Sequence, residues 1–245
     1  MPALGLKDRY QQICERIAAA AARARRNADQ VTLIAVTKSA APEQVKTLVE
    51  LGQRDLAESR VQQLMQRAAQ ITEWLQRQAG KTDKPLPRPE EIVWHMIGHL
   101  QRNKVKPVLP LVRCIHSVDS LRLADEIQAG MTKMDHTMQI MLEVNVAGES
   151  SKYGVAVGAA VHLAEQIDTM EGVSLVGLMG MAPYSEDPEQ ARPYFVRLRE
   201  IHEEVRFRKI GGAGFKHLSM GMSGDYQVAI EEGSTMVRIG SALFA

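Results

Sequence analysis

Strand-like and helix-like stretches alternate along this chain from residue 31 to its last residues. The strand-like stretches are short, apolar and rich in β-branched residues. We expect strands at 31–38, 54–58, 92–98, 112–117, 138–146, 173–181, 215–220 and 236–240. Regular alternation predicts a parallel sheet, and eight units in 245 residues favour a closed barrel over an open, doubly wound sheet.

Helices are expected between these strands, at 43–51, 60–78, 120–128, 155–169 and 188–204. A further amphipathic helix is expected in the first thirty residues, where Leu6, Tyr10, Ile13 and Ile17 recur at helical spacing. Residues 80–89 are polar and contain three prolines, which predicts a surface loop. The sequence therefore predicts one α/β domain over residues 1–245, a (β/α)8 TIM barrel with an extra N-terminal helix.

Composition and charge exclude several classes of function. A net charge of +1 gives no electrostatic basis for binding nucleic acid or an anionic membrane. No apolar run approaches the roughly 20 residues of a membrane span, and the charged N-terminus does not resemble a signal peptide. Cys14 and Cys114 lack metal-ligand spacing and are typical of reduced thiols. We expect a cytoplasmic protein without a metal ion and without nucleic-acid or membrane partners.

Lys38 stands at the carboxyl end of the first expected strand, where barrel active sites form. A lysine delivered from a buried strand needs a partner for its charge or a lowered pKa. A lysine of lowered pKa can form a Schiff base with an aldehyde cofactor. The alternative is a side chain that extends from the strand end into solvent.

A phosphate site is expected near the ends of the last two strands, as in many barrels. The seventh expected strand leads into Ser219 and a stretch rich in glycine and serine, and the eighth leads into Gly240 and Ser241. Glycine lets backbone N–H groups approach a phosphate, and serine hydroxyls add donors. These residues could also be ordinary turn residues.

Arg238 is flanked by Val237 and Ile239, so it faces the barrel interior if those two residues face the helices. Placed against a pyridine nitrogen, a guanidinium would keep that nitrogen unprotonated. Arg238 could instead pair with a core carboxylate such as Glu143 or Glu232, and the pattern leaves both interpretations open.

Several segments, in order along nearly the whole chain, resemble the pyridoxal 5′-phosphate (PLP) binding barrels of fold type III. Within that group the resemblance is closest to the pyridoxal phosphate homeostasis proteins. The segments are AVTK at 35–38, WHMIGHLQRNK at 94–104, IHSVD at 115–119, EVN at 143–145, SKYG at 151–154, GLM at 177–179, LSMGMS at 218–223 and GSTMVRIGS at 233–241. Together they are specific, whereas Lys38 alone is not.

The resemblance implies a role for each matching residue. Lys38 is similar to the lysine that forms the internal aldimine with PLP, and Arg238 to the arginine near the ring nitrogen. The phosphate cradle would comprise Ser219 with the backbone of Met220, and Gly240 with Ser241. His95 would line the site, and Lys152 is a second lysine in a family motif.

One segment departs from the family. Where relatives carry Gly-Glu-Asn, this chain has Ala57-Glu58-Ser59. The asparagine that matches Ser59 contacts the cofactor in the family. Because serine is shorter and has no amide, we expect that contact to be bridged by water or lost.

Two functions from different classes are compatible with this resemblance. One is a binding protein that holds PLP as an aldimine, in intracellular vitamin B6 homeostasis. The other is a PLP-dependent amino-acid racemase or decarboxylase, which needs a second proton-transfer group opposite the lysine. The candidates His95, His217 and Tyr153 are each better explained as structural, and we expect no counterpart of the C-terminal β domain that related racemases have.

We therefore expect a binder without turnover and without catalytic residues. We expect a monomer, or at most a weak dimer, that supplies PLP to PLP-requiring apoenzymes. A barrel enzyme that binds phosphate without PLP is a third alternative, which leaves Lys38 unexplained.

Overall fold

The computed structural model describes residues 4–81, 85–149 and 152–245. Within these residues the strands are β1 (Thr32–Val36), β2 (Asp55–Glu58), β3 (Val93–Met96), β4 (Cys114–Val118), β5 (Met138–Asn145), β6 (Val155–Ala156), β7 (Val173–Gly180), β8 (His217–Ser219) and β9 (Met236–Ile239). Each of the eight predicted strands overlaps one of them.

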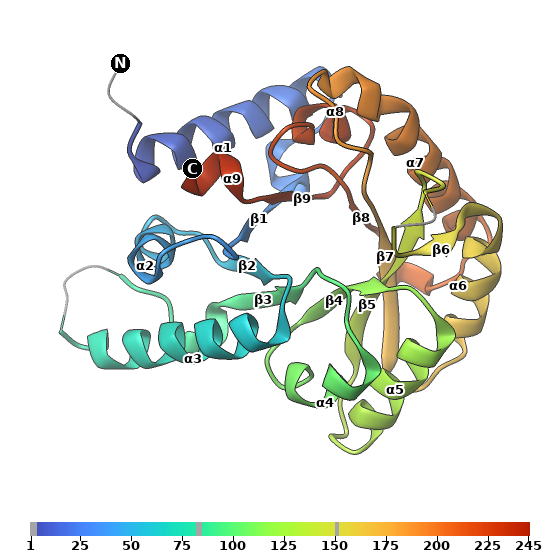
Figure 1. Cartoon of the computed structure of the whole chain (residues 1–245), viewed down its shortest axis with the longest axis horizontal. Coiled ribbons are helices and arrows are strands. Elements are labelled where there is room, and N and C mark those ends of the chain that lie inside the picture. The colour runs from blue at the N-terminus through green and yellow to red at the C-terminus, as the bar shows by residue number, and fades with distance from the viewer. Residues whose placement is uncertain (1–3, 82–84, 150–151) are drawn as a thin grey trace.

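The strands close into a parallel barrel (Figure 1). The ring runs β1-β2-β3-β4-β5-β7-β8-β9 and returns to β1, because β9 pairs with β1 and β4 pairs with β5. The two-residue strand β6 lies outside the ring and pairs in parallel with the carboxyl end of β5. The predicted TIM barrel is confirmed.

The helices surround the ring (Figure 1). Among the described residues the α-helices are α1 (Leu6–Arg23), α2 (Pro42–Glu50), α3 (Val61–Gln78), α4 (Val105–Val108), α5 (Leu121–Thr132), α6 (Ala160–Asp168), α7 (Arg192–Phe207), α8 (Tyr226–Glu231) and α9 (Ser241–Phe244). The predicted N-terminal helix is α1, which packs against α2, α8 and α9 over the junction of β1 with β9. No helix of the described ranges has the length and apolarity to cross a membrane.

Three connections differ from the prediction. Residues 155–156 start the predicted helix at 155–169 but form β6, because they pair with the end of β5. Residues 188–191 form a 3-10 turn before α7, in which the Asp187 carboxylate accepts the N–H of Glu189 at 3.0 Å. Helix α4 was not predicted, because Pro107 interrupts its apolar pattern.

The predicted loop at 80–89 is described only in part. Residues 82–84 lie outside the described part of the chain. Gly80, Lys81 and residues 85–88 form turn and irregular structure, as expected of a loop, and a 3-10 turn begins at Pro89.

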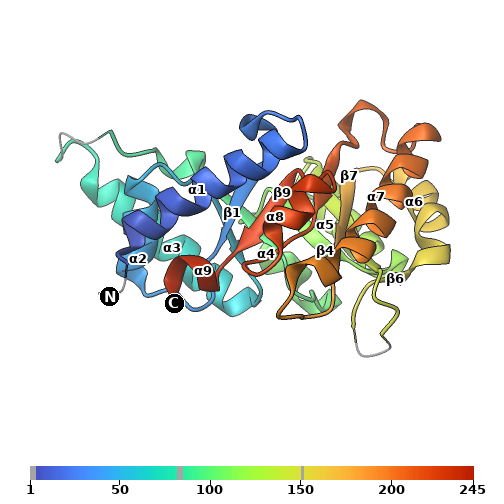
Figure 2. The ribbon, with the colours of Figure 1, turned by 90° about the horizontal axis from the view of Figure 1, so that it is seen from above.

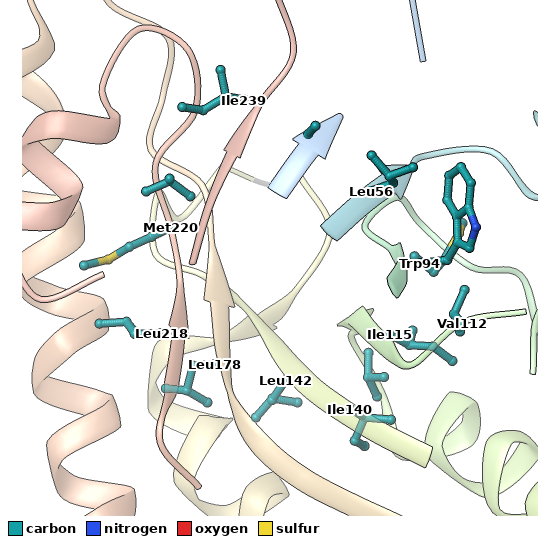
Figure 3. Close-up of a cluster of buried hydrophobic side chains, with 14 of the residues drawn as sticks. Leu56, Trp94, Val112, Ile115, Ile140, Leu142, Leu178, Leu218, Met220 and Ile239 are labelled. Carbon is teal, nitrogen blue, oxygen red and sulfur yellow. The ribbon is translucent and has the colours of Figure 1, made fainter. Parts of the chain in front are cut away.

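Side chains alternate between the two faces of the barrel wall, as in any strand. The outward set, which includes Trp94, Leu142 and Leu218, packs between the strands and the helices (Figure 3). A smaller apolar cluster that includes Ile34 and Met141 fills the barrel interior. This alternation explains how a narrow barrel buries apolar residues on both sides of its wall.

All strands of the ring are parallel, so their carboxyl ends meet at one edge of the barrel. In Figure 2, α9, which follows β9, and the short strand β6 both lie toward the lower side of the view. Side chains from distant segments of the sequence are therefore brought together there.

Candidate functional site

A cavity of about 490 Å³ opens at the carboxyl ends of the strands. Five of the eight predicted site residues line it: Lys38, Ser59, Arg238, Gly240 and Ser241. A second depression, of about 540 Å³, lies on the outer surface between α6 and α7 and contains none of the predicted residues. The strand-end cavity is therefore the candidate functional site, because barrel chemistry forms at these ends.

Lys38 lies two residues beyond the end of β1, and its side chain is exposed at the cavity. No carboxylate of the described residues is within ion-pair distance of its amine. The Lys38 side chain therefore extends from the strand end into the cavity, where it is in contact with solvent. This side chain forms part of the cavity wall.

Hydrogen bonds from polar side chains fix the backbone on both sides of Lys38. The Thr37 hydroxyl donates to the Glu58 carboxylate at 2.5 Å, and Arg67 donates to the carbonyl oxygens of Thr37 and Ala40 at 3.1 and 2.9 Å. Glu58 is fully buried, which raises its pKa against the lowering effects of the Thr37 hydrogen bond and the Arg67 charge. These contacts fix the position from which the Lys38 side chain extends.

Arg238 faces the barrel interior, because its neighbours Val237 and Ile239 pack among the helices. Its guanidinium donates to the Ser219 hydroxyl oxygen at 2.6 Å and to the Gly180 carbonyl oxygen at 3.1 Å. Burial lowers the pKa of Arg238 to about 10, and the carboxylates of Glu143 and Asp225 oppose this effect. Arg238 therefore remains a cationic donor at neutral pH.

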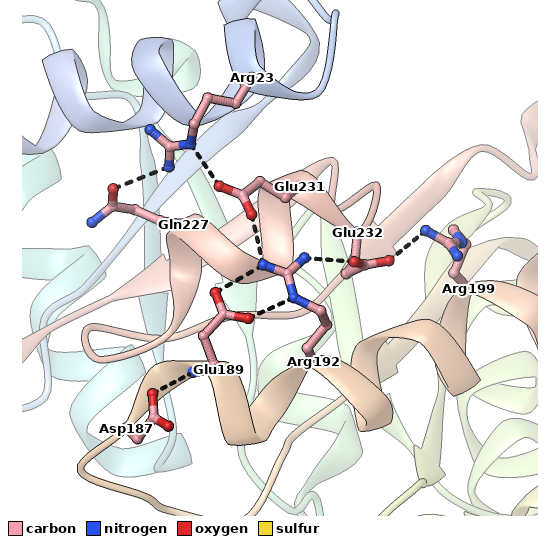
Figure 4. Close-up of polar contacts among 8 residues, drawn as sticks. All are labelled: Arg23, Asp187, Glu189, Arg192, Arg199, Gln227, Glu231 and Glu232. Carbon is pink, nitrogen blue, oxygen red and sulfur yellow. Dashed lines mark hydrogen bonds and ion pairs between the residues drawn. The ribbon is translucent and has the colours of Figure 1, made fainter.

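The ion pair considered between Arg238 and Glu232 is not formed. Glu232 lies outside the barrel, where it binds Arg192 and Arg199 at 2.6 and 2.5 Å (Figure 4). Glu143 also makes no ion pair with Arg238, although its charge acts on the pKa of Arg238. Two neutral oxygens are the hydrogen-bond acceptors of Arg238 in place of a carboxylate.

Three predicted residues lie beneath the cavity and do not line it. Ser219 is fully buried, and its hydroxyl contacts Arg238 and His116. His95 is buried between Asp55 and His116. The Met220 side chain packs in the outer apolar core (Figure 3).

Unlike Ser219, Ser223 in the loop after β8 lines the cavity. Its oxygen accepts the N–H groups of Gly240 and Ala242 at 3.3 and 3.1 Å, so its own O–H can donate into the cavity. Gly221 makes the turn before Ser223 with a φ of +92°, a conformation that favours glycine. Ser223, Gly240 and Ser241 form a corner rich in donors.

Glu143 lines the cavity as a carboxyl group that titrates near neutral pH. Burial raises its pKa to about 7, and the neighbouring charge of Asp119 adds to this effect, whereas Arg238 opposes it. At neutral pH this group can either donate or accept a proton.

An aromatic pair stands at the mouth of the cavity. The rings of His99 and Tyr153 stack with centroids 3.9 Å apart and an interplanar angle of 10°. His99 Nδ1 also lies 3.3 Å from an Asp119 carboxylate oxygen. Tyr153 is 55% exposed, so this wall of the cavity is in contact with solvent.

Two positions singled out by the family resemblance have different surroundings. Ser59 lines the cavity, and Gly98 packs against its backbone so closely that a Cβ at Gly98 would lie 2.2 Å from the Ser59 carbonyl oxygen. Lys152 is paired with Glu149 at 2.8 Å and does not line the cavity, although its neighbour Tyr153 does.

Sequence reasoning assigned no cofactor-binding role to Ser39, His99, Glu143, Tyr153 and Ser223. Period two along β5 places Glu143 on the same face as Met141, which could have identified it as an interior residue. Ser223 follows a glycine in a loop, so no strand periodicity indicates its direction. The stacking of His99 on Tyr153 joins residues 54 positions apart in the sequence, for which a single sequence carries no signal.

The family model of the alanine racemase N-terminal domain matches residues 12–245. Among curated proteins, the chain is 37% identical over 237 residues to the pyridoxal phosphate homeostasis protein of Aquifex aeolicus. That alignment covers 97% of this chain and 96% of the relative.

Two solved structures are also similar over nearly their whole length. A protein of unknown function from Bifidobacterium adolescentis has a TM-score of 0.87 at 34% identity, with 98% of this chain and 94% of that chain covered. PipY of Synechococcus elongatus PCC7942, solved with PLP bound, has a TM-score of 0.77 at 27% identity, with 95% and 100% covered.

Proposed function

The chain belongs to the family of pyridoxal phosphate homeostasis proteins, and we propose that it binds PLP as an aldimine of Lys38 and serves vitamin B6 homeostasis without turnover. The single observation that carries the proposal is that one strand-end cavity contains an unpaired lysine, a buried arginine and a corner of serine and glycine donors. PLP bound to the related protein PipY supports the same ligand.

The donors in the cavity fit the groups of PLP. The Lys38 amine would condense with the aldehyde and release water. The O–H of Ser223, the Ser241 hydroxyl and nearby backbone N–H groups would bind the phosphate. When bound, PLP supplies an electrophilic carbon and a ring that can accept electrons.

Arg238 supports a binder more than an enzyme. A guanidinium donates hydrogen bonds and does not accept them, so against the pyridine nitrogen it would keep that nitrogen unprotonated. An unprotonated ring is a weaker electron acceptor. The exposed wall at Tyr153 would also admit water, which favours exchange of the cofactor over protected carbanion chemistry.

The proposal is tested by the visible absorbance of the protein with PLP, before and after borohydride, followed by peptide mass mapping. We expect a visible band that borohydride removes, with the adduct on Lys38. Lys38→Ala should lose the band. Lys152→Ala is the matched control, because Lys152 is a nearby lysine paired with Glu149. A band that survives in Lys38→Ala would refute the assignment.

A second candidate function, amino-acid racemisation or decarboxylation, is favoured by one observation. Glu143, with a pKa raised to about 7 by burial, lines the same cavity as Lys38 and could serve as a second proton-transfer group. Deuterium uptake at Cα from heavy water, measured with a panel of amino acids, would reveal this activity. It should be absent if the protein only binds PLP.

We further propose that the protein is a cytoplasmic monomer that supplies PLP-requiring apoenzymes. The unpaired thiols of Cys14 and Cys114 support a reducing compartment. Mixing the PLP-loaded protein with an apoenzyme and following recovery of that enzyme's activity tests the transfer.

A further inference from the structure

Five side chains form a line of hydrogen bonds through the interior of the barrel. Asp55 Oδ1 lies 3.0 Å from His95 Nε2, and His95 Nδ1 lies 3.0 Å from His116 Nε2. His116 Nδ1 is 3.0 Å from the Ser219 hydroxyl, which accepts from Arg238 at 2.6 Å. The line therefore runs from the amino end of β2 to the cavity at the opposite end of the barrel.

The two ends of this line determine where each proton lies. Arg238 can only donate, and the Asp55 carboxylate can only accept. With neutral histidines, the Asp55 carboxylate accepts the Nε2–H of His95, which leaves His95 Nδ1 and then His116 Nδ1 as acceptors. Ser219 therefore donates its own proton to His116 Nδ1. His116 in turn donates from Nε2 to His95 Nδ1, and His95 donates from Nε2 to Asp55. For neutral histidines only this arrangement satisfies all four bonds, and it places the proton of both rings at Nε2.

Burial agrees with this arrangement. Ser219 and His116 have no exposed surface, and His95 is 3% exposed. Burial holds the pKa of His116 well below its usual 6.5, and the positive charge of Arg238 lowers it further. Asp55 is the member nearest to solvent, with a side chain 29% exposed, so the carboxylate stands where its charge is partly hydrated.

A metal ion is the competing occupant. Ligand atoms of His95, Cys114 and His116 all lie within 4.8 Å of one another, and all three residues are buried. His116 Nε2–H already donates a hydrogen bond to His95 Nδ1, however, so a metal ion would have to displace that proton. Burial also strongly raises the pKa of the Cys114 thiol, which opposes the thiolate that a metal would bind.

We propose that Asp55, His95, His116 and Ser219 are positioning residues that fix the orientation of the Arg238 guanidinium. Because Ser219 donates to His116, its oxygen is a stronger acceptor for Arg238. Together with the Gly180 carbonyl, Ser219 holds two of the five N–H groups of Arg238 and leaves the others for the cavity. The effect on PLP rests on the function proposed above, whereas the orientation of Arg238 does not.

The first test uses the protein without PLP and ¹⁵N NMR of its histidine and arginine side chains. We expect neutral Nε2–H tautomers for His95 and His116 and slow rotation of the Arg238 guanidinium. Ser219→Ala should make that rotation fast. Cys114→Ala is the matched control, because Cys114 lies beside the histidines but outside the hydrogen-bonded line, and it should leave the rotation slow.

Two results would overturn the proposal. One is rotation in Ser219→Ala that remains as slow as in Cys114→Ala. The other is stoichiometric zinc or copper in the purified protein that is lost in Cys114→Ala. If Ser219→Ala does not fold, Asp55→Ala replaces it, because alanine accepts no hydrogen bond from His95 Nε2. Unchanged tautomers and unchanged Arg238 rotation in that variant count against the proposal.

The second test measures PLP affinity by titration of the visible band. Ser219→Ala should weaken binding about tenfold, since it removes a hydrogen bond to a charged group, and Cys114→Ala should stay within about twofold. Equal affinities in the two variants would exclude an effect on the cofactor. If the wild type binds no PLP, the proposed function fails while the NMR experiment still tests the orientation of Arg238.

Discussion

Charged side chains are stabilised in different ways in the barrel interior and on the outer surface near α7. In the interior, neutral His95, His116 and Ser219 connect one cation to one carboxylate that is partly exposed. On the outer surface, charged groups contact each other directly and tie α1, α7 and α8 together (Figure 4).

The centre of the outer network is Arg192. It binds Glu189 and Glu231 at 2.7 Å and Glu232 at 2.6 Å. Arg23 of α1 also binds Glu231, and Arg199, which is on α7 like Arg192, also binds Glu232. These groups remain partly hydrated, so direct ion pairing costs little desolvation. In the interior, an arginine in direct contact with a carboxylate would require both charged groups to lose their hydration. Neutral side chains placed between the two charges avoid that loss. The two regions should therefore respond differently to mutation, salt and pH.

The largest loss of stability is expected from His116→Ala. This change removes a buried side chain and leaves His95 Nδ1 and the Ser219 O–H each without its partner, so the free energy of unfolding should fall by about 3 kcal/mol. Urea denaturation at low and high salt measures it, and the loss should be independent of salt. A loss below about 1 kcal/mol would mean that the line adds little to stability.

A smaller effect is expected from Arg192→Met in the outer network. The ion pairs of Arg192 with the partly buried Glu231 and Glu232 should together contribute about 1 kcal/mol, and 1 M NaCl should remove most of that contribution. The same urea experiment measures both values. A loss that salt leaves unchanged would show that Arg192 acts through packing and not through charge.

The stability contributions of the two regions should depend on pH in different ranges. The pKa of His116 is lowered in the folded state, so below its usual 6.5 the unfolded state binds more protons and the folded state loses stability. The cost of His116→Ala should therefore shrink as pH falls below 6.5, by up to about 1.4 kcal/mol per pH unit.

The outer carboxylates act in a lower pH range. Arg192 lowers the pKa values of Glu189 and Glu231 from their usual 4.5, so their stabilisation is present above that pH and is lost as pH falls below it. The cost of Arg192→Met should stay constant between pH 7 and pH 5. A cost that already declines at pH 6 would contradict the assignment of these pKa shifts.

The smallest effect is expected from coupling between the two regions. They share no residue, so the effects of Ser219→Ala and Arg192→Met on unfolding should add to within about 0.5 kcal/mol. Ser219→Ala and Asp55→Ala lie on the same line and should deviate from additivity by more than this. Equal deviations in the two double variants would mean that the line does not act as a unit.

The sequence predicted the parts of the site that follow from strand periodicity and strand ends. Val237 and Ile239 faced the helices as expected, so Arg238 faced the interior, and Lys38 lay at the cavity because it follows a buried strand. The closed barrel also followed from the count of alternating units, and the family resemblance adds the PLP ligand.

What the sequence could not predict depends on contacts between distant segments. Ser219 and Ser223 are equally plausible phosphate donors in the sequence, and only the loop after β8 distinguishes them. Likewise, His95 and His116 each look like single core histidines. Their partners are 40, 21 and 103 residues away, so their common line depends on the closure of the barrel.

The burial of that line also limits how quickly its hydrogens exchange with solvent. The Ser219 O–H and the His116 Nε2–H have no surface through which water can reach them, so deuterium should replace them only when the barrel opens. Their exchange would be much slower than that of solvent-exposed imidazole or hydroxyl groups. Two side-chain hydrogens at the centre of the barrel would therefore report how often its wall separates.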